Sequence, residues 1–84
     1  MTKTVETAAP KLRFTLYSRS YCHLCEDMAR ALRERGVAFV EVDVDADAQL
    51  EARYGERVPV LSDPDGCEIC HYFLDYAALA RALG

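Results

Sequence analysis

Two cysteines separated by two residues stand where one side-chain pattern gives way to another. Residues 12–17 alternate apolar and polar side chains, as a β-strand does, and residues 24–35 place apolar side chains at helical spacing. Cys22 and Cys25 therefore lie at a strand-to-helix junction, with Cys22 at or just before the first helical turn. This junction constrains the fold more than any other stretch of the chain.

The position favours chemistry at the two thiols. The thiolate is the form that attacks a disulfide, and the free N–H groups and positive dipole end of a helix N-terminus stabilise such an anion. The i, i+3 spacing puts both sulfur atoms on one helix face, where they can form a disulfide. We therefore predict a redox motif with an exposed, acidified thiol at Cys22 and a shielded partner at Cys25. His23 is either a solvated residue or a cation that lowers the pKa of the Cys22 thiol.

The rest of the chain alternates strand and helix patterns. Strands are predicted at residues 11–18, 37–44, 57–61 and 67–73, and helices at residues 23–35, 46–54 and from 76 onward. The near-continuous apolar run at 37–44 predicts a strand covered on both faces. The order βαβαββα predicts an α/β fold with a four-stranded mixed sheet, helices on both faces, and the first two strands parallel and adjacent.

Length and charge limit the class of protein. Residues 11–84 suffice for one small domain, and the polar residues 1–10 are predicted to form a flexible arm. The net charge of −4, without a basic patch, argues against nucleic acid as a partner. No run resembles a secretory signal or a membrane span, so we expect a cytoplasmic monomer without membrane contact. Four cysteines in a reducing compartment indicate redox work or metal.

Three features together resemble the thioredoxin fold, and specifically a bacterial subgroup of small glutaredoxin-like proteins. They are the Tyr-Ser-Arg-Ser-Tyr-Cys-His-Leu-Cys stretch at residues 17–25, the Val58-Pro59 pair, and the hairpin followed by a final helix. The resemblance covers residues 12–83. It implies a thiol–disulfide oxidoreductase in which Cys22 attacks a protein disulfide or a glutathione mixed disulfide and Cys25 resolves the intermediate.

The resemblance also implies substrate-binding residues. A cis peptide bond at Val58–Pro59 would present the backbone of Val58 to an extended substrate beside the dithiol. Arg19 matches the basic position that holds a glutathione carboxylate, and Asp75 matches the acidic residue before the last helix. Tyr21, next to the nucleophile, is a candidate for shaping the substrate groove. We expect no bound cofactor, with glutathione as the candidate co-substrate and disulfide-containing proteins or small thiols as partners.

Some positions depart from the glutaredoxin pattern. The family's Gly-Gly pair before the last helix is replaced here by bulky residues such as Tyr72 and Phe73, which are expected to narrow the glutathione groove. The proline of the family's Cys-Pro-Tyr-Cys motif is replaced by His23. These differences count against glutathione as the reductant, but they do not affect the prediction of the fold or of the dithiol.

A second C-x-x-C pair, Cys67 and Cys70, keeps a metal-binding alternative open. Two such pairs are also the pattern of a four-cysteine zinc site. These two cysteines fall in a strand-like run, where residues three apart lie about 10 Å apart and cannot bridge each other. We therefore expect no metal and no chemistry there. The alternatives for the whole chain are a zinc or iron–sulfur module that uses Cys22, and a thioredoxin-fold binding module with an idle dithiol.

Overall fold

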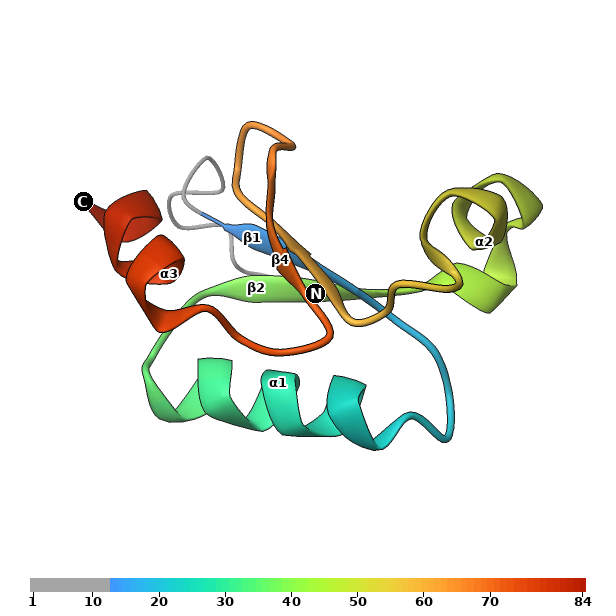
Figure 1. Cartoon of the computed structure of the whole chain (residues 1–84), viewed down its shortest axis with the longest axis horizontal. Coiled ribbons are helices and arrows are strands. Elements are labelled where there is room, and N and C mark those ends of the chain that lie inside the picture. Colours follow the sequence, from blue (N-terminus) through green and yellow to red (C-terminus); the bar gives the residue numbers. More distant parts are fainter. Residues whose placement is uncertain (1–12) are drawn as a thin grey trace, which may run out of the picture.

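The computed structural model describes residues 13–84, so the predicted arm at residues 1–10 lies outside the described residues. The elements follow the predicted order along the chain (Figure 1). They are β1 Phe14–Ser18, α1 His23–Glu34, β2 Phe39–Asp43, the 3₁₀ helix η3 Val44–Ala46, α2 Ala48–Tyr54, β3 Val60–Ser62, β4 Glu68–His71 and α3 Tyr76–Leu83. None of the helices in this part of the chain is both long and apolar enough to cross a bilayer.

The four strands form one mixed sheet in the order β2-β1-β3-β4. Strand β1 runs parallel to β2 and antiparallel to β3, and β3 pairs antiparallel with β4. The predicted parallel pairing of the first two strands is thus confirmed. The register sets Ser18, at the end of β1 that leads to the dithiol, opposite Asp43, and it sets Leu16, in the middle of β1, opposite both Glu41 and Leu61.

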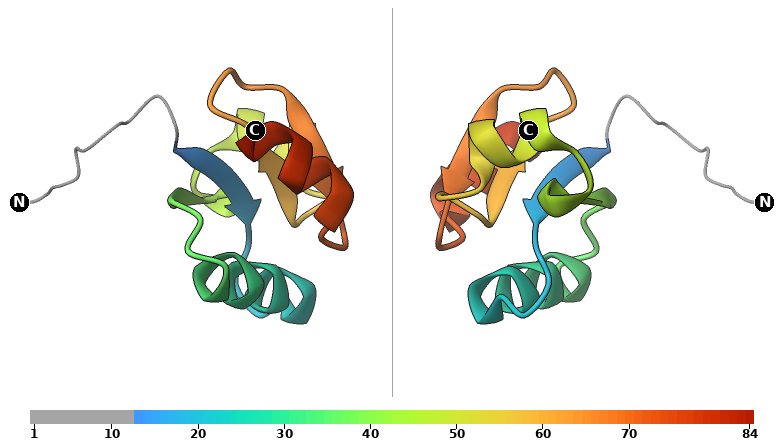
Figure 2. Two further views of the ribbon diagram at one scale, coloured as in Figure 1. Left: turned by 90° about the vertical axis from the view of Figure 1, so that its left-hand side faces the viewer. Right: turned by 90° about the vertical axis from the view of Figure 1, so that its right-hand side faces the viewer.

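Helices cover both faces of the sheet. On one face α1 and α3 pack on the strands through a buried cluster that includes Phe14, Leu16, Leu32, Leu61 and Leu79. On the other face α2 packs through what we call the dithiol cluster, composed of Cys25, Val44, Tyr54, Val58 and Val60. Figure 2 shows α1 running below the strands and α3 lying beside the β3–β4 hairpin. The predicted thioredoxin-like α/β fold is confirmed.

The prediction that the second strand is covered on both faces is wrong. Strand β2 lies at the edge of the sheet, and its five residues are half-buried or exposed. Val37 and Val44, at the two ends of the apolar run, are the buried ones, and both lie outside the strand. The residues at the two ends of the run are apolar because they pack in the two clusters. The apolar composition of the run therefore does not indicate a strand in the centre of the sheet.

Two other elements depart from their predicted bounds. Strand β3 begins at Val60, after Pro59, and β4 ends at His71, so Tyr72 and Phe73 belong to the connection into α3. Helix α3 buries Leu79, whereas Leu83 at the end of the helix is 55% exposed. Helix α3 is eight residues long and lies at one side of the sheet. Its buried residue, Leu79, therefore makes most of the apolar contact between this helix and the core.

Side-chain caps fix where the helices begin. Asp47 is the N-cap of α2, and its carboxylate accepts a hydrogen bond of 2.8 Å from the Gln49 backbone N–H. We expect Asp47→Ala to lower the free energy of unfolding by about 1 kcal/mol, because an N–H of the first turn loses its acceptor. Urea denaturation checks this, with Asp65→Ala as the control because the Asp65 side chain lies in an exposed turn. Equal stability of the two variants would contradict the capping role.

Candidate active site

The strand-to-helix junction places the two cysteines as a disulfide. Cys22 is the N-cap of α1 in extended backbone conformation, and Cys25 lies one turn further on. The two form a disulfide with a Cα–Cα distance of 5.2 Å. The Cys22 Sγ also accepts a hydrogen bond of 3.1 Å from the Cys25 backbone N–H. The first turn of α1 therefore directs an N–H group at the sulfur that would carry negative charge after reduction.

The two sulfurs differ in access to solvent. Cys25 is 2% exposed and belongs to the dithiol cluster, whereas Cys22 is half-buried and packs against the edge of that cluster. Reagents in solution can therefore reach Cys22 more readily than Cys25.

The Val58–Pro59 segment packs beside the dithiol. Its peptide bond is cis, both residues are buried, and Val58 shares the dithiol cluster with Cys25. The Pro59 carbonyl accepts a hydrogen bond of 2.9 Å from the Tyr72 N–H, and the Tyr72 hydroxyl donates to the Glu56 carbonyl at 3.0 Å. Tyr72 thus ties the connection after β4 to the proline loop.

Arg19 is held by the protein's own carboxylates. Its guanidinium lies 3.0 Å from a carboxylate oxygen of Asp45 in η3 and 3.0 Å from one of Glu51 in α2. Its Nε atom is buried without a hydrogen-bond partner. A substrate carboxylate at Arg19 would have to compete with these two side chains, and the predicted role of Arg19 stays a prediction.

Tyr21 and His23 flank Cys22 and face solvent. Tyr21 is 98% exposed and has a φ of +61°, a left-handed conformation that a bulky residue seldom adopts. His23 is exposed at the first position of α1. The predicted substrate role of Tyr21 stays a prediction.

Asp75 has a structural task at the start of the last helix. It is the N-cap of α3 and accepts a hydrogen bond of 3.0 Å from the Ala78 N–H. It lines a pocket with Cys70 and His71, and this pocket shares no lining residue with the pocket next to Cys25. Its predicted contact with substrate stays a prediction.

A pocket of about 400 Å³ lies next to the buried sulfur. Its lining residues come from the end of β1, the loop before α1, α1 itself and β2: Ser18, Arg19, Ser20, Tyr21, Cys25, Glu26, Glu41 and Asp43. The Ser18 hydroxyl donates a hydrogen bond of 3.0 Å to Glu41 Oε2. Sequence reasoning missed Glu41 and Asp43 as residues near the dithiol. The parallel pairing of β1 with β2, which sets Ser18 beside Asp43, is the signal that could have found them.

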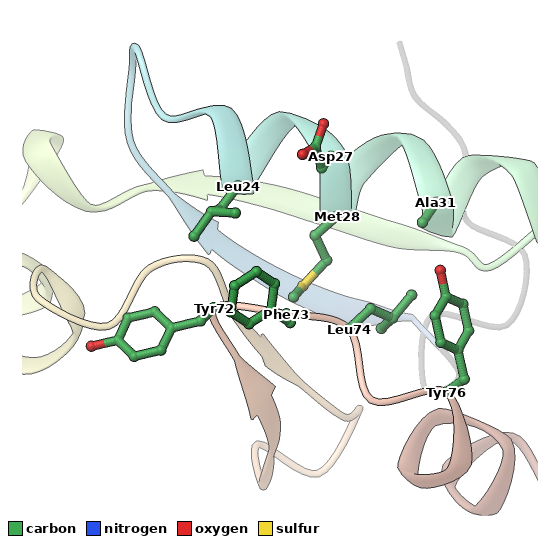
Figure 3. Close-up of a pocket in the computed structure, with 8 residues that line it drawn as sticks. All are labelled: Leu24, Asp27, Met28, Ala31, Tyr72, Phe73, Leu74 and Tyr76. Carbon is green, nitrogen blue, oxygen red and sulfur yellow. The ribbon is translucent and has the colours of Figure 1, made fainter.

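An apolar groove of about 250 Å³ begins inside the C-x-x-C motif and was also missed (Figure 3). Leu24, Met28 and Ala31 of α1 form one side, and Tyr72, Phe73, Leu74 and Tyr76 form the other. Figure 3 shows Leu24 and Met28 directed toward the Phe73 side of the groove. Phe73 is 70% exposed, so its ring is available for contact at this rim.

Cys67 and Cys70 are free thiols in different surroundings. Cys67 is exposed before β4, whereas Cys70 is half-buried within it. Burial raises the pKa of the Cys70 thiol. Across residues 13–84, no group of three or more His, Cys, Asp and Glu side chains is placed to hold a metal ion.

This difference predicts selective alkylation. With the Cys22–Cys25 disulfide intact, we expect iodoacetamide at pH 7.5 to modify Cys67 several times faster than Cys70, because Cys70 is less exposed and burial raises the pKa of its thiol. Peptide mass spectrometry of timed samples measures both rates. Equal rates in the folded protein, together with equal rates in urea, would contradict the surroundings described for Cys70.

The comparisons with known proteins agree with the fold. The family described as Glutaredoxin-like domain (DUF836) matches residues 13–84. The X-ray structure of the structural genomics target XcR50 from X. campestris is 46% identical, with 83% of this chain and 93% of that chain covered and a TM-score of 0.71. The solution structure of protein Ne2328 from Nitrosomonas europaea is 32% identical, covers both chains fully and has a TM-score of 0.79. No curated protein matches the chain.

Proposed function

The chain belongs to the glutaredoxin-like domain family, and from this membership we propose that it is a thiol–disulfide oxidoreductase acting through Cys22 and Cys25. The observation that carries the proposal is the disulfide between these residues at the N-terminus of α1. A helix N-terminus stabilises a thiolate, which is both the attacking and the leaving form in disulfide exchange.

The difference in burial supports separate roles for the two cysteines. In the reduced protein the Cys22 thiolate attacks one sulfur of a substrate disulfide, forms a mixed disulfide, and releases the other substrate sulfur as a thiolate. The Cys25 thiol then loses its proton and attacks the Cys22 sulfur, which releases the second substrate thiolate. Two electrons pass to the substrate, and the Cys22–Cys25 disulfide is restored. Because Cys25 is 2% exposed, it acts within the mixed disulfide and not on free substrate.

The substrates in this proposal are protein disulfides and glutathione mixed disulfides. The buried Val58–Pro59 segment beside Cys25 offers backbone against which an extended substrate chain can pair. The His23 side chain is exposed in the first turn of α1. When the imidazole is protonated, its positive charge favours the thiolate form of Cys22. Glutathione and a protein thiol donor are the two candidates for the reductant, and the experiment below separates them.

The reduction potential of the Cys22–Cys25 pair tests the function. We expect equilibration in glutathione redox buffers, followed by acid quenching and mass spectrometry, to give a two-electron couple at about −200 to −270 mV. Transient glutathione adducts on Cys22 would assign glutathione as the reductant. If no Cys22–Cys25 disulfide forms at any buffer ratio, the proposed function is wrong, and metal analysis of the purified protein would be the next measurement.

A further inference from the structure

The pocket beside the dithiol carries an excess of negative charge. Three carboxylate side chains line it, from Glu26 on α1 and from Glu41 and Asp43 on β2. Arg19 is the only basic residue among the lining residues of this pocket. Cys25 also lines this pocket, so these charges lie beside the buried sulfur of the disulfide.

The charge of Arg19 is already balanced. Two further carboxylates, from Asp45 and Glu51, each lie 3.0 Å from its guanidinium. Its side chain is 32% exposed, and a ligand that binds it has to compete with these two partners. The nearby arginines of α2 and the following loop line another pocket, together with Glu51 and Glu56. A charged substrate that approaches the dithiol from the β2 side therefore meets a net negative field.

We infer that the dithiol selects its substrates by charge, and that it reacts faster with disulfides flanked by cationic groups than with disulfides flanked by carboxylates. The inference rests on the proposed function and names the substrate class for the same site. A protein disulfide next to lysine or arginine residues fits this class. Glutathione disulfide fits it poorly, because each half carries one more carboxylate than ammonium group.

The physical cause is the field of a charge cluster whose net sign is negative. Such clusters raise the local concentration of oppositely charged substrates, and the gain in association rate ranges from about 10-fold to 1,000-fold at low salt. The effect reaches roughly 10 Å at 0.1 M salt and about 3 Å at 1 M salt. Selection by this field must therefore fade as salt is added, whereas selection by shape would persist.

Three small symmetrical disulfides test the inference. Cystamine is cationic, bis(2-hydroxyethyl) disulfide is neutral, and 3,3′-dithiodipropionate is anionic, and the three are of similar size. Each oxidises the reduced protein dithiol to the Cys22–Cys25 disulfide with release of two thiol molecules, so atoms and electrons balance. The rate constant for each is divided by its rate constant with dithiothreitol, which removes intrinsic reactivity. The rates are measured at pH 8, which is above the pH range in which histidine side chains usually change charge.

We expect the normalised rates at low salt to fall from cystamine to the neutral disulfide to the anionic one, with about a tenfold total range. We expect 1 M salt to reduce that range to less than about threefold. Equal normalised rates, or a faster anionic disulfide, would overturn the inference and leave the proposed function standing. If none of the three oxidises the dithiol, the proposed function fails and the inference falls with it.

Charge-removal variants locate the field. Glu41→Gln combined with Asp43→Asn keeps the hydrogen-bonding shape of both side chains, and we expect it to shrink the cystamine preference by about threefold. Asp65→Asn removes a charge from the β3–β4 turn, at the opposite end of the strands, and is expected to leave the preference unchanged. Equal effects of both changes would show that net charge, and not the pocket, sets the selectivity, and would overturn the inference.

Discussion

Replacing Cys22 by serine is expected to abolish disulfide exchange, with the rate falling to that of the uncatalysed reaction. The variant keeps the thiol of Cys25, but this residue is only 2% exposed. Its sulfur therefore cannot approach a substrate disulfide along the axis of the S–S bond. Serine at the N-cap still accepts the hydrogen bond from the Cys25 N–H, so α1 keeps its start and the fold is preserved. The measurement is reduction of a glutathionylated peptide under steady-state conditions, with circular dichroism to confirm folding.

The matched variant Cys25→Ser separates attack from resolution. We expect it to accept one glutathione on Cys22 from glutathione disulfide and to stop there, because the resolving sulfur is gone. Mass spectrometry of the intact protein, followed by peptide mapping, locates the adduct. An adduct confined to Cys67 in this variant, or full exchange activity in Cys22→Ser, would contradict the proposed assignment of the two cysteines.

The second large effect is expected in the core. Leu16 is 0% exposed in the middle of β1 and lies between β2 and β3 in the sheet. We expect Leu16→Ala to lower the free energy of unfolding by about 3–4 kcal/mol, through lost apolar burial and the cavity left behind. Since the free energy of unfolding of a small domain is about 5–15 kcal/mol, this loss is a large fraction of the stability.

Urea denaturation of the oxidised protein, followed by circular dichroism, measures the loss. Leu83→Ala is the matched control, because the same atoms are removed from a side chain that is 55% exposed in α3. We expect the control to change the free energy of unfolding by less than about 0.5 kcal/mol. Similar losses in the two variants would mean that β1 is not the centre of the core.

Local patterns were enough to predict the order of elements. The alternation before Cys22 and the helical spacing after it are properties of consecutive residues, and both appear as β1 and α1. The caps at Asp47 and Asp75 are equally local, because each side chain accepts its hydrogen bond from a backbone N–H two or three residues further on. The fold class followed from these parts because strands and helices in this order permit few topologies.

Contacts between distant residues could not be predicted in the same way. The Arg19–Asp45 and Arg19–Glu51 pairs join residues 26 and 32 positions apart. The placement of Glu41 near the dithiol depends on the register of β1 on β2, and a slip of one residue would turn its side chain to the other face. A run of apolar residues indicates burial but not which neighbours supply it, which is why β2 was misjudged.

The weak attachment of α3 has a consequence for how the molecule opens. Its buried contact is Leu79, which belongs to the cluster on the face opposite the dithiol cluster. Helices that bury little apolar surface can undock in a local opening that costs less free energy than global unfolding. We expect the backbone amides of α3 to exchange with deuterium earlier than those of β1 and β3. Such openings would expose the cluster that contains Leu79 and leave the packing around Cys25 intact. The dithiol would therefore keep its reactivity while α3 is undocked.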